Sequence, residues 1–204
     1  MAKRGTIYIN KSLGVGFIPI PKNGSTTIRK HVFNHNLKGA LKSMDDIPSE
    51  ELPKIRKIAI ISNPLTRFAR AIVEIRSRGE NTKTIESKEF RECKSNECKV
   101  ISVLKDIKEF GFYDEHLLPQ SDFLIDPLGN TYEVDEIWFL KDLTKKIKSI
   151  IPNYNGELTW TRGNNKKPFL DAIMGSKEIQ DQIRELYPED FKIFENPGII
   201  TNNK

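Results

Sequence analysis

The chain has 204 residues, of which 37% are hydrophobic and 30% are charged, and its 33 Lys and Arg against 28 Asp and Glu give a formal net charge of +5. This length suits one α/β domain over residues 1–204, and the basic balance favours anionic ligands. No run approaches the ~20 consecutive apolar residues of a membrane span. Polar residues 10–12 also interrupt the apolar stretch that a secretory signal requires. We therefore expect a cytoplasmic protein.

The two cysteines, Cys93 and Cys98, are separated by four residues in a charged segment. There is no second cysteine pair and no nearby histidine, which argues against a zinc site. In an oxidising compartment these two cysteines could form a local disulfide. For a cytoplasmic chain we favour two reduced thiols.

The first half of the chain alternates strands and helices. Apolar patterning predicts a hairpin or two short strands over residues 6–9 and 16–20, and then a helix from about 25 to 33. The apolar run 58–61 is continuous, as in a parallel strand covered on both faces. Residues 65–78 follow with helical spacing of their apolar positions. A strand, a turn and a helix thus occur twice in succession.

The second half continues this alternation after a polar segment, 79–100, which has no clear period. The expected elements are a helix over 101–110, a loop over 112–121, a strand and turn over 121–129, a strand over 134–140, a helix over 143–151, a basic loop over 159–168, a helix over 179–187 and a terminal turn at Phe191 and Phe194. This order predicts a three-layer α/β domain with a central, mainly parallel sheet flanked by helices. Ligands of such domains bind at the carboxyl ends of the strands.

The stretch 17–30 contains the strongest functional motif. An apolar strand leads into Pro-Lys-Asn-Gly-Ser-Thr-Thr and then into a helix. Backbone N–H groups at a helix start lack intrahelical partners and carry partial positive charge, so they favour phosphate or sulfate. Gly24 permits the turn and a close approach of backbone to ligand, while Lys22 adds a full charge. We expect the polyanion to be held by Lys22, Asn23, Gly24, Ser25, Thr26 and Thr27.

A second candidate anion site follows the strand 58–61. There the Asn63-Pro64 turn leads into a basic helix that carries Arg67 and Arg70. The alternative interpretation of this helix is a solvated face, which is usual for charge runs.

Pro21-Lys22-x-Gly24-Ser25-Thr26 resembles the loop by which sulfotransferases hold the 5′-phosphosulfate of 3′-phosphoadenosine 5′-phosphosulfate (PAPS). The resemblance implies a P-loop-like fold. In a Walker A loop the lysine follows the last glycine, whereas Lys22 precedes Gly24 by two residues. This order disfavours a nucleoside triphosphate kinase.

Residues 62–70 resemble the segment of the same family that binds the 3′-phosphate, Arg-(Asp/Asn)-Pro-x-x-Arg-x-x-Ser. Asn63, Pro64 and Arg67 match it. Ser62 stands where the family has its first arginine, and Arg70 stands where it has serine. Because Arg70 lies one helical turn after Arg67, it could supply the cation that is lost at position 62.

Further segments match in the expected order. Residues 116–120 resemble the His-x-x-Pro-Gln segment of carbohydrate sulfotransferases, 134–143 resemble their strand-to-helix segment, and 187–194 resemble their terminal Tyr-x-x-Asp-Phe-x-x-Phe. Lys166 and Lys167 precede the last of these segments. Each of the two lysines is expected either to bind a phosphate of the donor or to lie on the surface. The resemblance covers about residues 15–195.

The resemblance implies transfer of the sulfuryl group from PAPS to an acceptor hydroxyl, which we expect to lie on a sugar, without a metal. Lys22 would stabilise the departing 5′-phosphate oxygen and His116 would be the general base. Glu115, Asp45 and Asp46 are alternative bases. His31 is expected to pack or face solvent, and His35 to lie on the surface.

Two other functions remain open: a non-catalytic basic module that binds nucleic acid or anionic glycan, and a nucleotide-dependent kinase. Because aromatic and basic residues are not interleaved, the sequence does not predict a stacking platform for single strands. We expect a small-molecule or glycan acceptor as the partner, and neither nucleic acid nor a membrane.

Overall fold

The computed structural model describes residues 5–33, 40–77, 88–125, 132, 134–151, 154 and 166–201. The chain, predicted as a single domain, divides into two compact units. Unit 1 consists of Met1–Ser62, Pro119–Trp160 and Lys192–Lys204, and unit 2 of Asn63–Leu118 and Thr161–Phe191. Each unit is described by itself.

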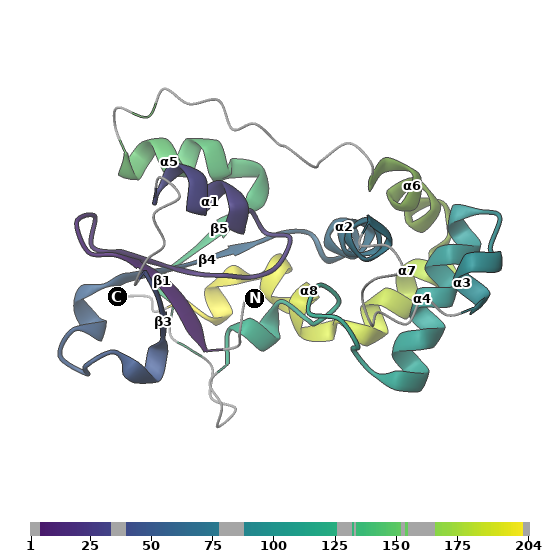
Figure 1. The fold of residues 1–204 in the computed structure, drawn as a ribbon, viewed down its shortest axis with the longest axis horizontal. Coiled ribbons are helices and arrows are strands. Elements are labelled where there is room, and N and C mark those ends of the chain that lie inside the picture. Colours follow the sequence, from purple (N-terminus) through teal and green to yellow (C-terminus); the bar gives the residue numbers. More distant parts are fainter. Residues whose placement is uncertain are drawn as a thin grey trace. The chain divides into compact units, whose positions relative to one another are not determined.

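Unit 1 is built on a five-stranded sheet in the order β3-β1-β2-β4-β5 (Figure 1). Its strands are β1 (Thr6–Asn10), β2 (Val15–Ile18), β3 (Leu41–Ser43), β4 (Arg56–Ile61) and β5 (Glu136–Phe139). β4 pairs in parallel with β2 and β5, whereas β1 pairs antiparallel with β2 and β3. The α/β class is therefore confirmed. The sheet is mixed, which corrects the prediction of a mainly parallel one.

The antiparallel part of the sheet follows from a short connection. A four-residue turn at 11–14 joins β1 to β2, and Gly14 adopts a left-handed φ of 62° there. So short a turn can only connect antiparallel strands, because parallel pairing requires a crossover. The predicted parallel strands are present as β2, β4 and β5, and their carboxyl ends meet at one edge of the sheet.

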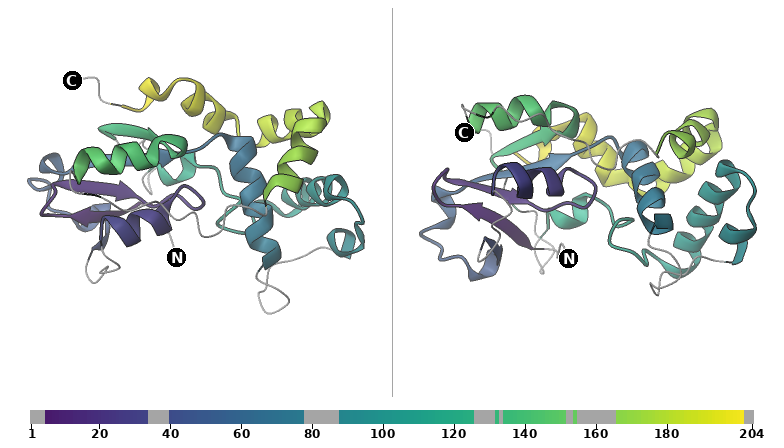
Figure 2. Two further views of the ribbon diagram at one scale, coloured as in Figure 1. Left: turned by 90° about the horizontal axis from the view of Figure 1, so that it is seen from above. Right: turned by 45° about the horizontal axis from the view of Figure 1, so that its top comes forward.

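Helices α1 (Ser25–His31) and α5 (Leu143–Ile150) cover one face of this sheet (Figures 1 and 2). Ile28 and Ile147 pack there with Phe17 and Trp138, whose rings lie 5.5 Å apart in an edge arrangement. Short 3-10 helices complete unit 1: η1 (Met44–Asp46), η2 (Leu52–Lys54), η3 (Ser121–Phe123), η4 (Leu140–Asp142) and η6 (Pro197–Ile199). A strand and turn were predicted over 121–129. The structure has η3 at the start of this range instead of a strand, and residues 126–130 lie outside the described part.

Unit 2 is helical. It contains α2 (Pro64–Ser77), α3 (Lys88–Glu92), α4 (Asn96–Phe110), α6 (Lys167–Gly175), α7 (Lys177–Leu186) and the start of α8 (Pro188–Glu195). Phe68, Leu104, Ile173 and Ile183 are among the buried residues of its core. Where a terminal turn was predicted, the structure has α8. None of the helices within the described ranges is long and apolar enough to cross a membrane.

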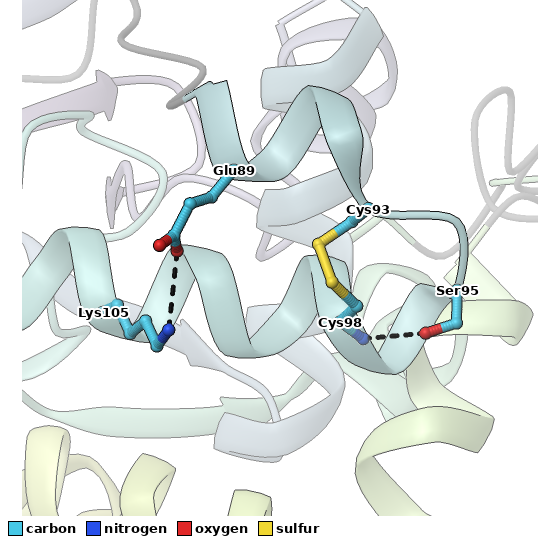
Figure 3. Close-up of a disulfide and its surroundings, with 5 residues drawn as sticks. All are labelled: Glu89, Cys93, Ser95, Cys98 and Lys105. Atoms are coloured by element: carbon cyan, nitrogen blue, oxygen red, sulfur yellow. Dashed lines mark hydrogen bonds and ion pairs between the residues drawn. A yellow bond between two sulfur atoms is a disulfide. The ribbon is translucent and has the colours of Figure 1, made fainter.

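A disulfide joins Cys93, just after α3, to Cys98 in the first turn of α4 (Figure 3). Two reduced thiols were the favoured prediction, and this is corrected. Ser95 accepts a hydrogen bond from the Cys98 N–H at 3.1 Å and caps α4, so the helix starts at Asn96 instead of 101. A 3.6 Å ion pair between Glu89 and Lys105 also links the two helices.

Candidate functional site

The loop that joins β2 to α1 contains two residues with left-handed backbone conformation. Lys22 has φ 67° and Gly24 has φ 82°. For a residue with a side chain this conformation costs about 1 kcal/mol, so the surroundings must hold Lys22 in place. Such a conformation at a lysine at the carboxyl end of a parallel strand is consistent with a functional loop.

A buried polar network holds this loop. Asn23, Ser62 and Gln120 are 2%, 6% and 2% exposed. The Asn23 Nδ2 donates to Gln120 Oε1 at 2.6 Å, and the Ser62 hydroxyl donates to Asn23 Oδ1 at 2.8 Å. Gln120 Oε1 also accepts from the Ser62 backbone N–H at 2.9 Å, while Gln120 Nε2 donates to the Ser62 carbonyl at 3.0 Å. A buried network satisfied in this way fixes the conformation of its members.

Residues of the sequence motifs have structural roles in this network. Ser62, predicted as a ligand of the donor, uses its hydroxyl to hold Asn23. Gln120 ends the His-x-x-Pro-Gln segment and was not predicted as a site residue, although its motif was recognised. Ser62 and the loop 19–24 share one sheet edge, as expected for segments that follow parallel strands.

Gly24 has a packing role that the sequence did not indicate. A Cβ at this position would lie 2.7 Å from Leu143 Cδ2 and 3.0 Å from Leu140 Cδ1. Glycine therefore lets the start of α1 approach η4 and α5, in addition to providing the left-handed turn. Ile28 N–H donates to the Gly24 carbonyl at 2.9 Å, so the amides of Ser25, Thr26 and Thr27 belong to the first turn, which α1 itself cannot satisfy.

Unit 2 brings two predicted cations together. Arg70 on α2 is half-buried, and its Nη1 is buried without a hydrogen-bond partner among the described residues. Burial lowers the pKa of the Arg70 guanidinium from its ordinary value. Lys166, at the N-cap of α6, has its pKa lowered by burial and then by the charge of Arg70. Two desolvated cations next to each other are suited to an anion, which would relieve their repulsion.

Two more predicted cations, Arg67 and Lys167, belong to unit 2. Arg67 is 2% exposed, and its backbone N–H donates to the carbonyl of Asn63 at 2.9 Å in the first turn of α2. Lys167 is exposed and forms a 2.6 Å ion pair with Asp171 one turn later on α6. Lys167 thus lies on the surface, while Lys166 lies beside Arg70.

His116, the predicted general base, is paired with a carboxylate. Its Nδ1 lies 2.7 Å from Asp114 Oδ1, and the same oxygen accepts the backbone N–H of His116 at 2.8 Å. Both side chains are buried, at 11% and 7% exposed. In the neutral imidazole a proton on Nδ1 leaves Nε2 as the basic nitrogen. Asp114 was not among the predicted bases, although its position two residues before His116 suits a turn in which Asp bonds to a nearby backbone N–H.

The segment that contains His116 is held by Tyr187 of the terminal motif, whose Oη donates to the Leu117 carbonyl at 2.7 Å. The Tyr187 ring contacts Phe68 and Phe112 at centroid distances of 5.9 and 5.5 Å. This hydrogen bond and these ring contacts fix the residue next to His116.

The structure describes two of the alternative bases, Glu115 and Asp46, only by their burial. Glu115 is half-buried and Asp46 is exposed. His31 packs edge-on against Tyr154 at 5.2 Å, as one of its two expected roles. The side chain of Asp45 and the whole of His35 lie outside the described part.

The described residues thus place the Lys22–Thr27 loop and Ser62 at one edge of unit 1, and bring Arg70 to Lys166 and Asp114 to His116 in unit 2. Within these residues, no group of three or more His, Cys, Asp or Glu side chains could hold a metal ion. Comparison with family models, with curated proteins and with solved structures finds no match for this chain.

Proposed function

We propose that this protein is a PAPS-dependent sulfotransferase with a three-layer, P-loop-like fold, which transfers the sulfuryl group to an acceptor hydroxyl on a carbohydrate. The observation that carries the proposal is the half-buried Arg70 with its unsatisfied Nη1 beside Lys166. A buried guanidinium nitrogen without a partner has a free-energy cost that a bound phosphate would offset.

Each unit, taken by itself, has residues that suit a phosphate or sulfate group of the donor. In unit 1, the amides of the first turn of α1 and the Lys22 ammonium suit the 5′-phosphosulfate. In unit 2, Arg70 and Lys166 suit the 3′-phosphate. PAPS supplies the sulfuryl group, and adenosine 3′,5′-bisphosphate is what remains of it after transfer.

The protein side of the reaction needs a base and a cation. His116 would take the proton of the acceptor hydroxyl on Nε2, while Asp114 holds the Nδ1 proton and orients the ring. Lys22 would balance the negative charge that develops on the departing oxygen. No step in this scheme requires a divalent ion.

The expected cytoplasmic location stays a prediction, and the Cys93–Cys98 disulfide weighs against it. Disulfides persist in oxidising compartments and are rare where thiols are kept reduced.

The test of the proposal is calorimetric titration with adenosine 3′,5′-bisphosphate and with ATP. We expect binding of the first and little of the second. Arg70→Met should weaken that binding about tenfold to a hundredfold, because a charge-assisted hydrogen bond is lost. Arg91→Met, which removes an exposed arginine of α3, is the matched control and should leave it unchanged.

Equal affinity for ATP would favour the kinase, and binding of neither nucleotide would exclude both enzymes and leave the non-catalytic basic module. Turnover itself is measured by offering labelled PAPS with a panel of sugar and phenol acceptors. Transfer to phenols alone would contradict the carbohydrate acceptor.

A further inference from the structure

The Cys93–Cys98 disulfide lies at the surface of unit 2 (Figure 3). Cys98 is exposed and Cys93 is half-buried, and Lys94 and Ser95 between them are exposed. Residues 93–95 connect α3 to α4, so the disulfide closes the hairpin of these two helices at its connecting end. Cys98 is therefore accessible to a reductant in the folded protein.

The small size of the closed loop argues against a mainly structural role for this disulfide. Four residues separate the two cysteines, and a cross-link over so short a stretch removes little freedom from the unfolded chain. The core of unit 2 is contributed mainly by α2, α4, α6 and α7, and the disulfide joins no two of these helices. Its effect therefore falls on the attachment of α3 to α4.

Helix α3 depends on this attachment, since an isolated helix of five residues does not persist in water. Among residues 89–92, Phe90 alone is buried, at 6% exposed, and it joins the core of unit 2. The 3.6 Å ion pair of Glu89 with Lys105 joins side chains that are 61% and 62% exposed, and such surface pairs contribute little. The covalent bond at the end of α3 is thus a large part of what keeps this helix in place.

We infer that Cys93–Cys98 is a reversible thiol–disulfide site that controls the docking of α3 on α4. A thiolate of a dithiol reductant attacks Sγ of Cys98, the more exposed cysteine, and the bond to Cys93 breaks with release of the Cys93 thiolate. The second thiol of the reductant then displaces Cys98 from the mixed disulfide. The reductant leaves as its own disulfide, its two thiol protons end on the two cysteines, and α3 is no longer tied to α4.

This site gives the chain two states that are set by the redox conditions around it. Where thiols are kept reduced, α3 opens and the ring of Phe90 leaves the core, whereas in an oxidising compartment α3 stays docked. The inference applies to either location of the protein. It does not rest on the proposed sulfotransferase activity, because neither the cysteines nor α3 belong to the proposed donor site.

The first measurement is the rate at which dithiothreitol reduces the disulfide. The freed thiols are alkylated and counted by mass spectrometry, at a series of low urea concentrations that leave the protein folded. We expect a rate that does not depend on urea, because Cys98 is attacked at the native surface. A rate that rises with urea as steeply as the unfolding constant would mean that unfolding must precede reduction, and would overturn the inference.

The second measurement is amide hydrogen exchange, read by mass spectrometry on peptides. The Cys93 N–H donates to the Glu89 carbonyl at 3.0 Å and reports on the integrity of α3. We expect its peptide to exchange about tenfold or more faster after reduction, while peptides of α7 keep their rate. Oxidised dithiothreitol should restore the slow exchange. Cys93→Ser/Cys98→Ser should exchange like the reduced protein and should not respond to either reagent.

Glu89→Gln is the matched control, because it removes the ion pair with Lys105 and keeps the disulfide. Its α3 peptide should exchange less than about threefold faster than that of the unaltered protein. Equal exchange of α3 in the oxidised and reduced protein would show that burial of Phe90 suffices to hold the helix, and would overturn the inference. Faster exchange of α7 after reduction would show that the disulfide stabilises the whole of unit 2, and would overturn its local role.

Discussion

Asp114 Oδ1 accepts a hydrogen bond from the backbone N–H of His116 at 2.8 Å, and it lies 2.7 Å from Nδ1 of the His116 ring. One carboxylate oxygen thus fixes the turn and the tautomer of the histidine together. Since Asp114 contacts the ring and not the reacting atoms, it is a positioning residue in the proposed transfer.

Asp114→Asn should lower kcat about 100-fold or more and leave KM for the donor close to its original value. Asn retains an oxygen for the backbone N–H of His116 but lacks the charge that stabilises the imidazolium, so the fold should persist. Steady-state kinetics and thermal unfolding of the same preparation measure the two effects. Asp181→Asn, on the exposed side of α7, is the control. A parallel loss of kcat and of folded protein would mean that Asp114 is only structural.

Lys22→Gly should abolish turnover while raising the free energy of unfolding by about 1 kcal/mol. The left-handed φ of 67° costs nothing for glycine, whereas the ammonium that would balance the charge on the departing oxygen is lost. Lys22→Ala removes the same charge but keeps the backbone cost, so it should lose turnover without the gain in stability. Denaturant unfolding measures the gain in stability, and a turnover assay measures the effect of losing the Lys22 charge. Turnover that survived in the glycine variant would remove Lys22 from the mechanism.

Gly24→Ala should destabilise the protein by about 2–3 kcal/mol, because the new Cβ meets Leu143 and the φ of 82° is unfavourable for alanine. Gly14→Ala is a matched control with φ 62° and open space around the Cβ, and it should cost about 1 kcal/mol. The difference between the two urea midpoints measures the close packing of α1 on α5. Equal costs would show that Leu143 moves aside at little expense.

Binding of adenosine 3′,5′-bisphosphate should weaken with rising pH earlier than an ordinary lysine would allow. Only the protonated Lys166 attracts the anion, and its pKa lies below the usual 10.5. A bound phosphate favours the charged form and raises that pKa, so binding in the alkaline range should take up protons. Calorimetry in two buffers with different ionisation enthalpies measures the uptake. Lys166→Gln should remove it and Lys167→Gln should not. Uptake that persists in Lys166→Gln would assign it to another group.

The elements that the sequence predicted well are those with local determinants. The parallel strands β2 and β4 are continuous apolar runs, and α2 starts where Asn63 caps it and Pro64 opens it, with Thr66 N–H donating to Asn63 Oδ1 at 3.2 Å. Strand β3 is polar and exposed, and exists because β1 offers it an edge, so its own residues gave no pattern. α6 begins inside the basic loop predicted over 159–168 and was missed, although its buried residues Phe169 and Ile173 are four residues apart, as in a helix.

The candidate site likewise contains residues that could be predicted from the sequence and contacts that could not. Lys22 and His116 stand in short motifs, and their positions could be predicted from neighbours in the sequence. Gln120 and Ser62 are 58 residues apart, and their reciprocal hydrogen bonds depend on the fold of the sheet edge. The pairing of Arg70 with Lys166 is likewise a product of helix packing, which no spacing rule in the sequence encodes.

The two hydrogen bonds between Gln120 and Ser62 also describe how the chain leaves and re-enters unit 1. Asn63–Leu118, the first segment of unit 2, starts directly after Ser62 and stops two residues before Gln120. Its entrance and exit are therefore tied together within unit 1, as at the junction of an inserted domain. The core of unit 2 also contains Ile173 and Ile183 of its second segment, Thr161–Phe191. A segment that replaced residues 63–118 would therefore have to supply new apolar contacts for α6 and α7, although its two ends would join unit 1 at a fixed junction.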